Sequence, residues 1–254
     1  MTRLFLCLCC AIISFPLVAG TTVKATLTFV NRIELSTPLS GIVSQVNVKA
    51  GDRVTAGAIL IQLDSEPLKT ERDAAQAVVV QSKVSLDEVR REKQRNQDLY
   101  DQTLLSDHEI KQAEIDYATA LSIYRQAKSK LALSQQRLEY SDIQAPFDGL
   151  VIDVRVQAGQ TVTNRYQITP MIILARSGTM MANTQLDSNQ LNSLKTGDAV
   201  NVAVSNSSYE GRIVEIGLEP ITDQPQIRYP VSVEFSVPND VLLRSGMPAQ
   251  VDLP

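Results

Sequence analysis

Side chains that commonly carry out catalysis or bind metals are scarce in this chain. His108 is the only histidine, and the three cysteines, Cys7, Cys9 and Cys10, all lie near the N-terminus. No Ser/His/Asp set, HExxH or GxSxG motif, or glycine-rich phosphate loop accompanies His108. The sequence therefore predicts a protein that is not an enzyme, with no catalytic residue, no metal site and no cofactor.

Residues 1–20 have the pattern of a secretory signal peptide. Arg3 is followed by an apolar run from Leu4 to Ala19 and then by small residues, and the run is short for a membrane span. An uncleaved membrane anchor is the alternative. Because every cysteine lies in this segment, its removal leaves no thiol, which excludes disulfides and a cysteine nucleophile in the mature chain.

The charge balance also excludes a class of partner. The chain has 24 basic and 28 acidic residues, a net charge of −4. Proteins that bind nucleic acid usually present a basic patch or stripe. We therefore expect no nucleic acid partner.

The segment from Glu66 to Tyr140 predicts two long helices. It has no glycine and no proline after Pro67, and it is rich in helix-forming residues. Apolar residues recur every three or four positions in both halves, as in a coiled coil. The pattern breaks after Leu99, and Ser106 with Glu109 then forms a capping box that starts a second helix. We expect an antiparallel hairpin with arms of roughly 50 Å.

An internal repeat flanks this hairpin. The stretch Pro38–Thr55 aligns without a gap with Pro146–Thr163, at an offset of 108 residues. Each copy reads as a valine-rich strand, an Ala-Gly turn and the start of another strand, with Gly51 and Gly159 supplying positive φ. Two such halves bury a core only by facing each other, so residues 36–65 and 141–177 are predicted to form one β-sandwich.

Two further segments carry alternating apolar patterns. Residues 21–35 hold one half-buried strand, and residues 178–254 hold several short strands and one short helix, which is typical of a small β-barrel. The predicted fold class is mainly β, interrupted by a long α-helical coiled-coil hairpin.

The repeats and the order of the modules resemble a known family. The spacing G-x-V-x-x-V-x-V-x-x-G-x-x-V is similar to that of the biotinyl/lipoyl domain, split by a helical hairpin as in the periplasmic adaptor (membrane fusion) proteins of Gram-negative efflux and secretion pumps. The resemblance implies a periplasmic location, with association at the inner membrane. Such adaptors usually add a membrane-proximal domain after the barrel, and in this sequence only the strand in residues 21–35 is available for one.

The resemblance also implies docking and gating residues. Arg95, Leu99 and Ser106 have the spacing R-x3-L-x6-S, similar to the hairpin-tip motif by which adaptors dock onto TolC-like outer-membrane channels. The alternative makes Ser106 only a helix cap. Gln157 and Gln160 flank the second Ala-Gly turn and resemble the glutamine loop that gates the axial channel of macrolide-exporter adaptors; an ordinary polar turn is the alternative.

The expected partners follow from the same resemblance. They are an inner-membrane transporter of the ABC or RND type, a TolC-like channel and further copies of the chain in a ring, for which the family implies a hexamer. The expected function is export of small molecules. An adaptor for protein or peptide secretion and a coiled-coil scaffold without a transport role are the alternatives.

A carrier function is a separate alternative raised by the lipoyl-like pattern. Carrier domains attach biotin or lipoate to a lysine on a tight hairpin between the two halves. Here Asp64-Ser65-Glu66-Pro67 opens the helical segment at that place, and Lys69 falls within the helix. The sequence therefore favours a domain without the attached cofactor.

Overall fold

The structure is a computed structural model of the whole chain, and it describes residues 21–163, 170–221, 227–238 and 241–253. The predicted signal peptide and its cysteines lie outside the described residues. The chain forms two units, one from residues up to Val30 together with residues from Gly178 onward, and the other from Asn31 to Ser177.

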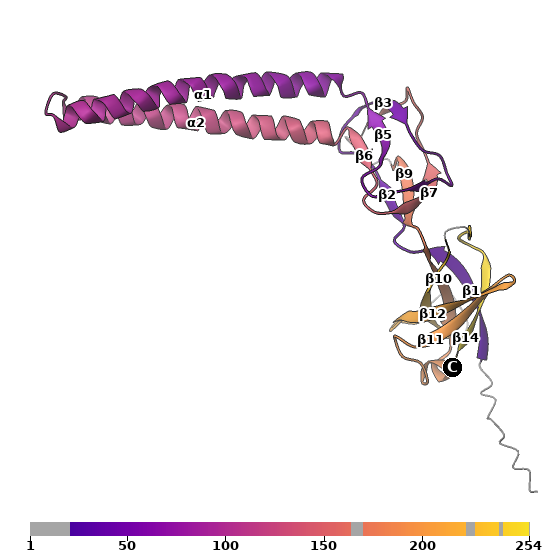
Figure 1. The fold of residues 1–254 in the computed structure, drawn as a ribbon. Coiled ribbons are helices and arrows are strands. Elements are labelled where there is room, and N and C mark those ends of the chain that lie inside the picture. Colours follow the sequence, from indigo (N-terminus) through magenta and orange to yellow (C-terminus); the bar gives the residue numbers. More distant parts are fainter. Residues whose placement is uncertain (1–20, 164–169, 222–226, 239–240, 254) are drawn as a thin grey trace, which may run out of the picture. The chain divides into compact units, whose positions relative to one another are not determined.

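The first unit is a closed six-stranded barrel with the strand order β1-β10-β13-β12-β11-β14 (Figure 1). Every neighbouring pair is antiparallel. Its elements are β1 (Thr21–Phe29), β10 (Thr179–Leu186), the short helix α3 (Ser188–Leu191), β11 (Ala199–Val204), β12 (Ser207–Ile216), β13 (Tyr229–Ser236) and β14 (Pro248–Leu253).

The position of β1 differs from the expectation of a separate N-terminal strand. It pairs with β10 on one side and with β14 on the other, with Thr21 opposite Leu253. Leu27 is fully buried in the barrel core beside Ala182, Val233 and other side chains from the remaining strands. The strand is therefore one of the barrel strands. It closes the barrel because it pairs with the edges of β10 and β14 that would otherwise be free.

The second unit contains two four-stranded sheets, ordered β2-β9-β7-β4 and β6-β5-β3-β8. Their strands are β2 (Ile33–Leu35), β3 (Gly41–Val46), β4 (Arg53–Val54), β5 (Ile59–Leu63), β6 (Asp142–Gln144), β7 (Gly149–Val154), β8 (Thr161–Val162) and β9 (Ile172–Arg176). One apolar cluster collects side chains from both sheets, including Val43 and Ile61 from one and Val151 and Leu174 from the other. The sheets thus enclose a single core.

The two sequence repeats exchange strands in this unit. β3 of the first repeat pairs with β8 of the second, and β4 of the first pairs with β7 of the second. The turns match as well: the Gly51 amide donates to the Val151 carbonyl, and the Gly159 amide donates to the Val43 carbonyl, each at 2.8 Å. Since these bonds are related by the repeat offset, the two halves have approximate twofold symmetry.

Two helices are inserted between the repeats. Helix α1 spans Glu66–Asp101 and helix α2 spans Asp107–Glu139, and together they cover the predicted hairpin segment. Figure 1 shows them side by side along their length, joined by a short loop at the end remote from the strands. Neither core cluster includes a helical residue from this pair. Among the described residues, no helix is long and apolar enough to span a membrane.

Candidate functional site

The seam between α1 and α2 is built mainly from small side chains, with one leucine and one isoleucine. The buried seam residues are Ala75, Ser82 and Leu86 in α1 and Ile110, Ala113, Ala120, Ala127 and Ser134 in α2. Their spacing of three, four or seven is the coiled-coil pattern predicted from the sequence. Near the strands, Glu71 of α1 also pairs with Arg137 at 3.1 Å and Lys130 at 3.5 Å of α2. The seam thereby fixes the register that places the tip.

The capping box at the start of α2 is confirmed. The Glu109 amide donates to Ser106 Oγ at 3.4 Å, and Glu109 Oε2 accepts from the Ser106 amide at 2.9 Å and from the Ser106 hydroxyl at 2.6 Å. These bonds to the carboxylate lower the pKa of Glu109, first of all through the Ser106 hydroxyl. The single proton of the Ser106 hydroxyl is therefore already donated within the chain.

A second side-chain bond closes the tip from the other helix. The Tyr100 hydroxyl donates to Asp107 Oδ1 at 2.6 Å, and this bond raises the pKa of Tyr100. Within the loop, the Thr103 amide donates to the Tyr100 carbonyl and the Leu104 amide to the Leu99 carbonyl, at 2.8 and 2.9 Å. The five-residue connection is thus held at both ends.

The three residues of the predicted docking motif all lie at this tip, in different environments. Arg95 is exposed, and within the described residues no ion pair or hydrogen bond of its guanidinium is present. Its neighbour Arg91, by contrast, pairs with Glu88. Leu99 is half-buried, and Ser106 is exposed but engaged in the cap. The geometry therefore leaves Arg95 as the free donor of the set.

One tip residue was missed by the sequence reasoning. Leu104 is 68% exposed. In the sequence, it and Leu105 were interpreted only as a break in the heptad pattern, with no role of their own. Its backbone follows Thr103, whose φ of 59° is unusual for a β-branched residue. The only sequence feature that indicated an exposed leucine here was its position next to the break in helical periodicity.

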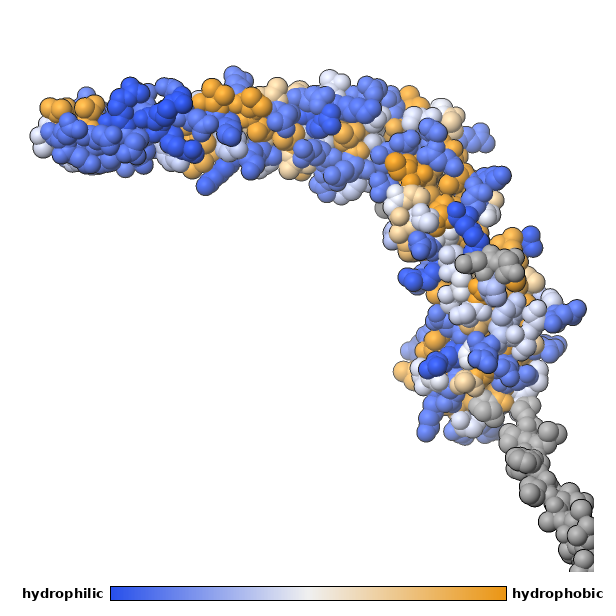
Figure 2. Space-filling view, in the orientation of Figure 1, coloured by the Kyte–Doolittle hydropathy of each residue, from blue (hydrophilic) through white to orange (hydrophobic). Residues whose placement is uncertain are grey.

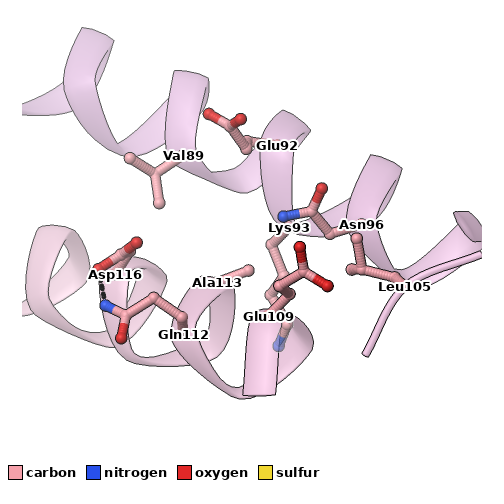
Figure 3. A pocket seen from close by; sticks show the side chains of 9 residues that line it. All are labelled: Val89, Glu92, Lys93, Asn96, Leu105, Glu109, Gln112, Ala113 and Asp116. Carbon is pink, nitrogen blue, oxygen red and sulfur yellow. Dashed lines mark hydrogen bonds between the residues drawn. The ribbon is translucent and has the colours of Figure 1, made fainter. Parts of the chain in front are cut away.

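A shallow groove of about 420 Å³ runs between the helices next to this tip. Figure 3 shows Lys93 and Asn96 of α1 facing Glu109 and Ala113 of α2, with Leu105 at the loop end. The small Ala113 side chain leaves the seam open here. The lining mixes acidic, basic and amide groups with a few aliphatic side chains.

The predicted gating glutamines occupy the two ends of one tight turn. The Gln160 amide donates to the Gln157 carbonyl at 3.1 Å, and the Gln157 amide donates to Gln160 Oε1 at 3.0 Å. Asp52 and Lys49 form the same two bonds in the first repeat. Gln160 thus has a structural task in its own turn, whereas the exposed Gln157 side chain has no bonding partner among the described residues.

The carrier lysine position is occupied by the start of α1. Lys69 lies in its first turns and pairs with Glu66 at 2.7 Å, so no tight hairpin displays it. In the part of the chain that the structure describes, no group of His, Cys, Asp and Glu side chains is arranged to hold a metal.

This architecture defines the class of protein. The model of the CzcB-like, barrel-sandwich hybrid domain matches residues 31–171, more than half of the chain. The chain belongs to this family, and its resemblance to membrane fusion adaptors is confirmed.

Individual relatives are consistent with that class. The macrolide export protein MacA of Yersinia pestis is 27% identical over 242 residues, which cover 88% of this chain and 65% of that protein. The membrane fusion protein Spr0693 from Streptococcus pneumoniae R6 matches 92% of this chain and 99% of its own, with a TM-score of 0.73 and 15% identity. MacA from Actinobacillus actinomycetemcomitans gives a TM-score of 0.67 at 22% identity, over 92% of this chain and 78% of its own. These two structures share the fold.

Proposed function

We propose that the protein is a non-enzymatic periplasmic adaptor that links an inner-membrane transporter to a TolC-like outer-membrane channel for the export of small molecules. The similarity to a macrolide export protein extends over 88% of the chain and supports this role. A shorter match to the multidrug resistance protein MdtA of Yersinia enterocolitica, 26% identical over 58% of the chain, favours small molecules over proteins as cargo. The transporter is of the ABC or RND type.

The adaptor acts as a ring of identical subunits, six in the family pattern. A closed ring uses one repeated head-to-tail contact, and such contacts close by rotation. In this arrangement the turn at Gln157 and Gln160 borders the axial passage. The exposed amide of Gln157 is the group free to contact cargo or a neighbouring turn, while Gln160 maintains the turn.

The single observation that carries the proposal is the exposed guanidinium of Arg95 at the hairpin tip, which is unpaired within the described residues. Arg95 lies exposed in the last turns of helix α1, whose other arginines are each paired with an acidic neighbour: Arg72, Arg90 and Arg91. A planar guanidinium without an internal partner is a strong donor to carbonyl or carboxylate groups of another protein. Arg95, supported by Leu99 and Ser106, is the docking residue at this site.

The test is site-specific crosslinking of the full chain to the TolC-like channel in cells, read together with export of a macrolide. Arg95→Ala should lower both the crosslink and export. Arg91→Ala is the matched control, because it removes an exposed arginine from the same helix that is already paired with Glu88. Equal crosslinking and export by both variants, at equal protein level and helicity, would contradict docking through Arg95.

A parent chain that crosslinks to no channel would contradict the adaptor proposal itself. Export of a protein or peptide in place of macrolides, with the crosslink intact, would favour the secretion alternative. A non-transport scaffold would show neither crosslink nor export dependence.

A further inference from the structure

Leu104 is the most exposed large apolar side chain of the hairpin. Its exposed fraction is 68%, whereas Leu99 before the loop and Leu105 within it are half-buried. Figure 2 shows hydrophobic surface at the free end of the hairpin, bordered by hydrophilic surface. An aliphatic side chain in that position gains free energy when a partner removes it from water.

The backbone of the loop holds Leu104 in place. Thr103 has a φ of 59°, a conformation that a β-branched residue rarely adopts and that persists only where surrounding contacts impose it. Those contacts are the bonds from the Thr103 and Leu104 amides to the carbonyls of Tyr100 and Leu99. A fixed anchor loses little conformational entropy on binding, which favours affinity.

Several carboxylates at the end of α1 and along the first turns of α2 have no cationic partners among the described residues. Asp98, Asp101, Asp107, Glu109 and Asp116 each accept a hydrogen bond from a neutral side chain, namely Gln94, Gln97, Tyr100, Ser106 and Gln112. Within the described residues, none of the five carboxylates forms an ion pair, whereas Glu71, at the other end of the hairpin, is paired with Lys130 and Arg137. These carboxylates keep their negative charge, and they share the tip with the exposed guanidinium of Arg95.

We infer that Leu104, rather than Leu99, is the apolar anchor of the tip, and that it enters an apolar socket whose rim carries lysine or arginine side chains. This inference rests on the proposed function, in which the partner is the outer-membrane channel. The apolar socket follows from the exposed leucine, and the basic rim follows from the charge that the carboxylates of the two helix ends present to a partner. The half-buried Leu99 contributes through its backbone, since its carbonyl accepts the hydrogen bond from the Leu104 amide.

The test measures binding of the full chain to the purified TolC-like channel, from the bacterium that encodes the chain, in lipid nanodiscs. Leu104→Ser should raise the dissociation constant at least about tenfold, which corresponds to ~1.4 kcal/mol of lost binding free energy. Val84→Ser is the matched control, because Val84 is 64% exposed on α1 away from the loop, and it should bind like the parent. The double variant Asp98→Asn with Asp101→Asn should bind more weakly and lose part of its salt dependence.

The outcomes separate the inference from the proposed function. If the parent binds and Leu104→Ser binds equally well, Leu104 is not the anchor although the adaptor role stands. If neutralising Asp98 and Asp101 leaves binding unchanged or strengthens it, the basic rim is wrong. If the parent does not bind the channel at all, the adaptor role and this inference fall together.

Discussion

Tyr100 and Asp107 join the two helices across the hairpin tip, because the Tyr100 hydroxyl donates to Asp107 Oδ1 at 2.6 Å. Tyr100 lies in the last turn of α1, and Asp107 is the first residue of α2. The bond spans the loop that displays Leu104, so its strength bears on how firmly the tip keeps its shape.

The first prediction concerns the ionisation of Tyr100. The bond to Asp107 requires the neutral phenol, and the nearby carboxylate disfavours phenolate, so the pKa of Tyr100 should lie above its ordinary value. Any stabilisation from this bond is present below the unfolded-state pKa and is lost as the pH rises through the raised folded-state pKa. Ultraviolet titration, with the Tyr100→Phe spectrum subtracted, measures this value. Asp107→Asn should lower it, and Asp116→Asn should not.

The second prediction concerns the cap of α2. Ser106→Ala removes the side-chain acceptor for the Glu109 amide and the donor to its carboxylate, and loss of such a cap costs about 1 kcal/mol. Hydrogen exchange should accelerate at the first amides of α2 and remain unchanged near Tyr140. Ser122→Ala, an exposed position within the same helix, serves as the control.

The cap also has a pH signature. Because the Ser106 bonds lower the pKa of Glu109, their contribution is present above the unfolded-state pKa and is lost as the pH falls through the lowered folded-state pKa. In Ser106→Ala, the pKa of Glu109 measured by NMR should return toward its ordinary value. An unchanged Glu109 pKa would show that another group causes the shift.

Local sequence patterns predicted the helices and strands well, because each pattern depends on which side chains of one segment are buried. The heptads and the Ser106 cap marked both helices, and the repeat marked the strands around Gly51 and Gly159. The partner of β1 was not predictable in the same way, because pairing Thr21 with Leu253 joins the two extremes of the described chain. Leu104 was missed because its exposure depends on the backbone at Thr103. Threonine rarely adopts a positive φ, so the sequence does not indicate this conformation.

The third prediction uses the symmetry of the repeats. Gly51 and Gly159 have φ of 94° and 86°, and a Cβ added at either meets no atom within 4 Å. Alanine at each position should therefore destabilise by a similar amount, roughly 1 kcal/mol, from backbone strain alone. At Gly149 an added Cβ would lie 2.8 Å from the Ala175 carbonyl oxygen, so Gly149→Ala should cost more.

Denaturant unfolding of the three variants measures this order. Gly41→Ala is the control, because its added Cβ would make only an ordinary 3.7 Å contact with Leu63 Cδ1 and its φ is not positive. Clearly unequal effects at Gly51 and Gly159 would mean that the two turns are not equivalent in solution.

The fourth prediction is that the hairpin can be removed without unfolding the β units. Its ends meet at the pairing of β5 with β6, where the Leu63 amide donates to the Ser141 carbonyl at 2.8 Å. A short Gly-Ser linker in place of residues 66–139 can therefore close the gap with little loop entropy. Since neither apolar cluster includes a residue of α1 or α2, both cores should remain intact.

Circular dichroism and denaturant unfolding test this removal. The shortened chain should lose most of its helical signal, keep its strand signal and still unfold cooperatively. It should also fail to bind the channel, since the tip is gone. Loss of the strand signal would show that α1 and α2 are needed for folding of the sheets, and retained channel binding in a folded variant would place docking on another surface.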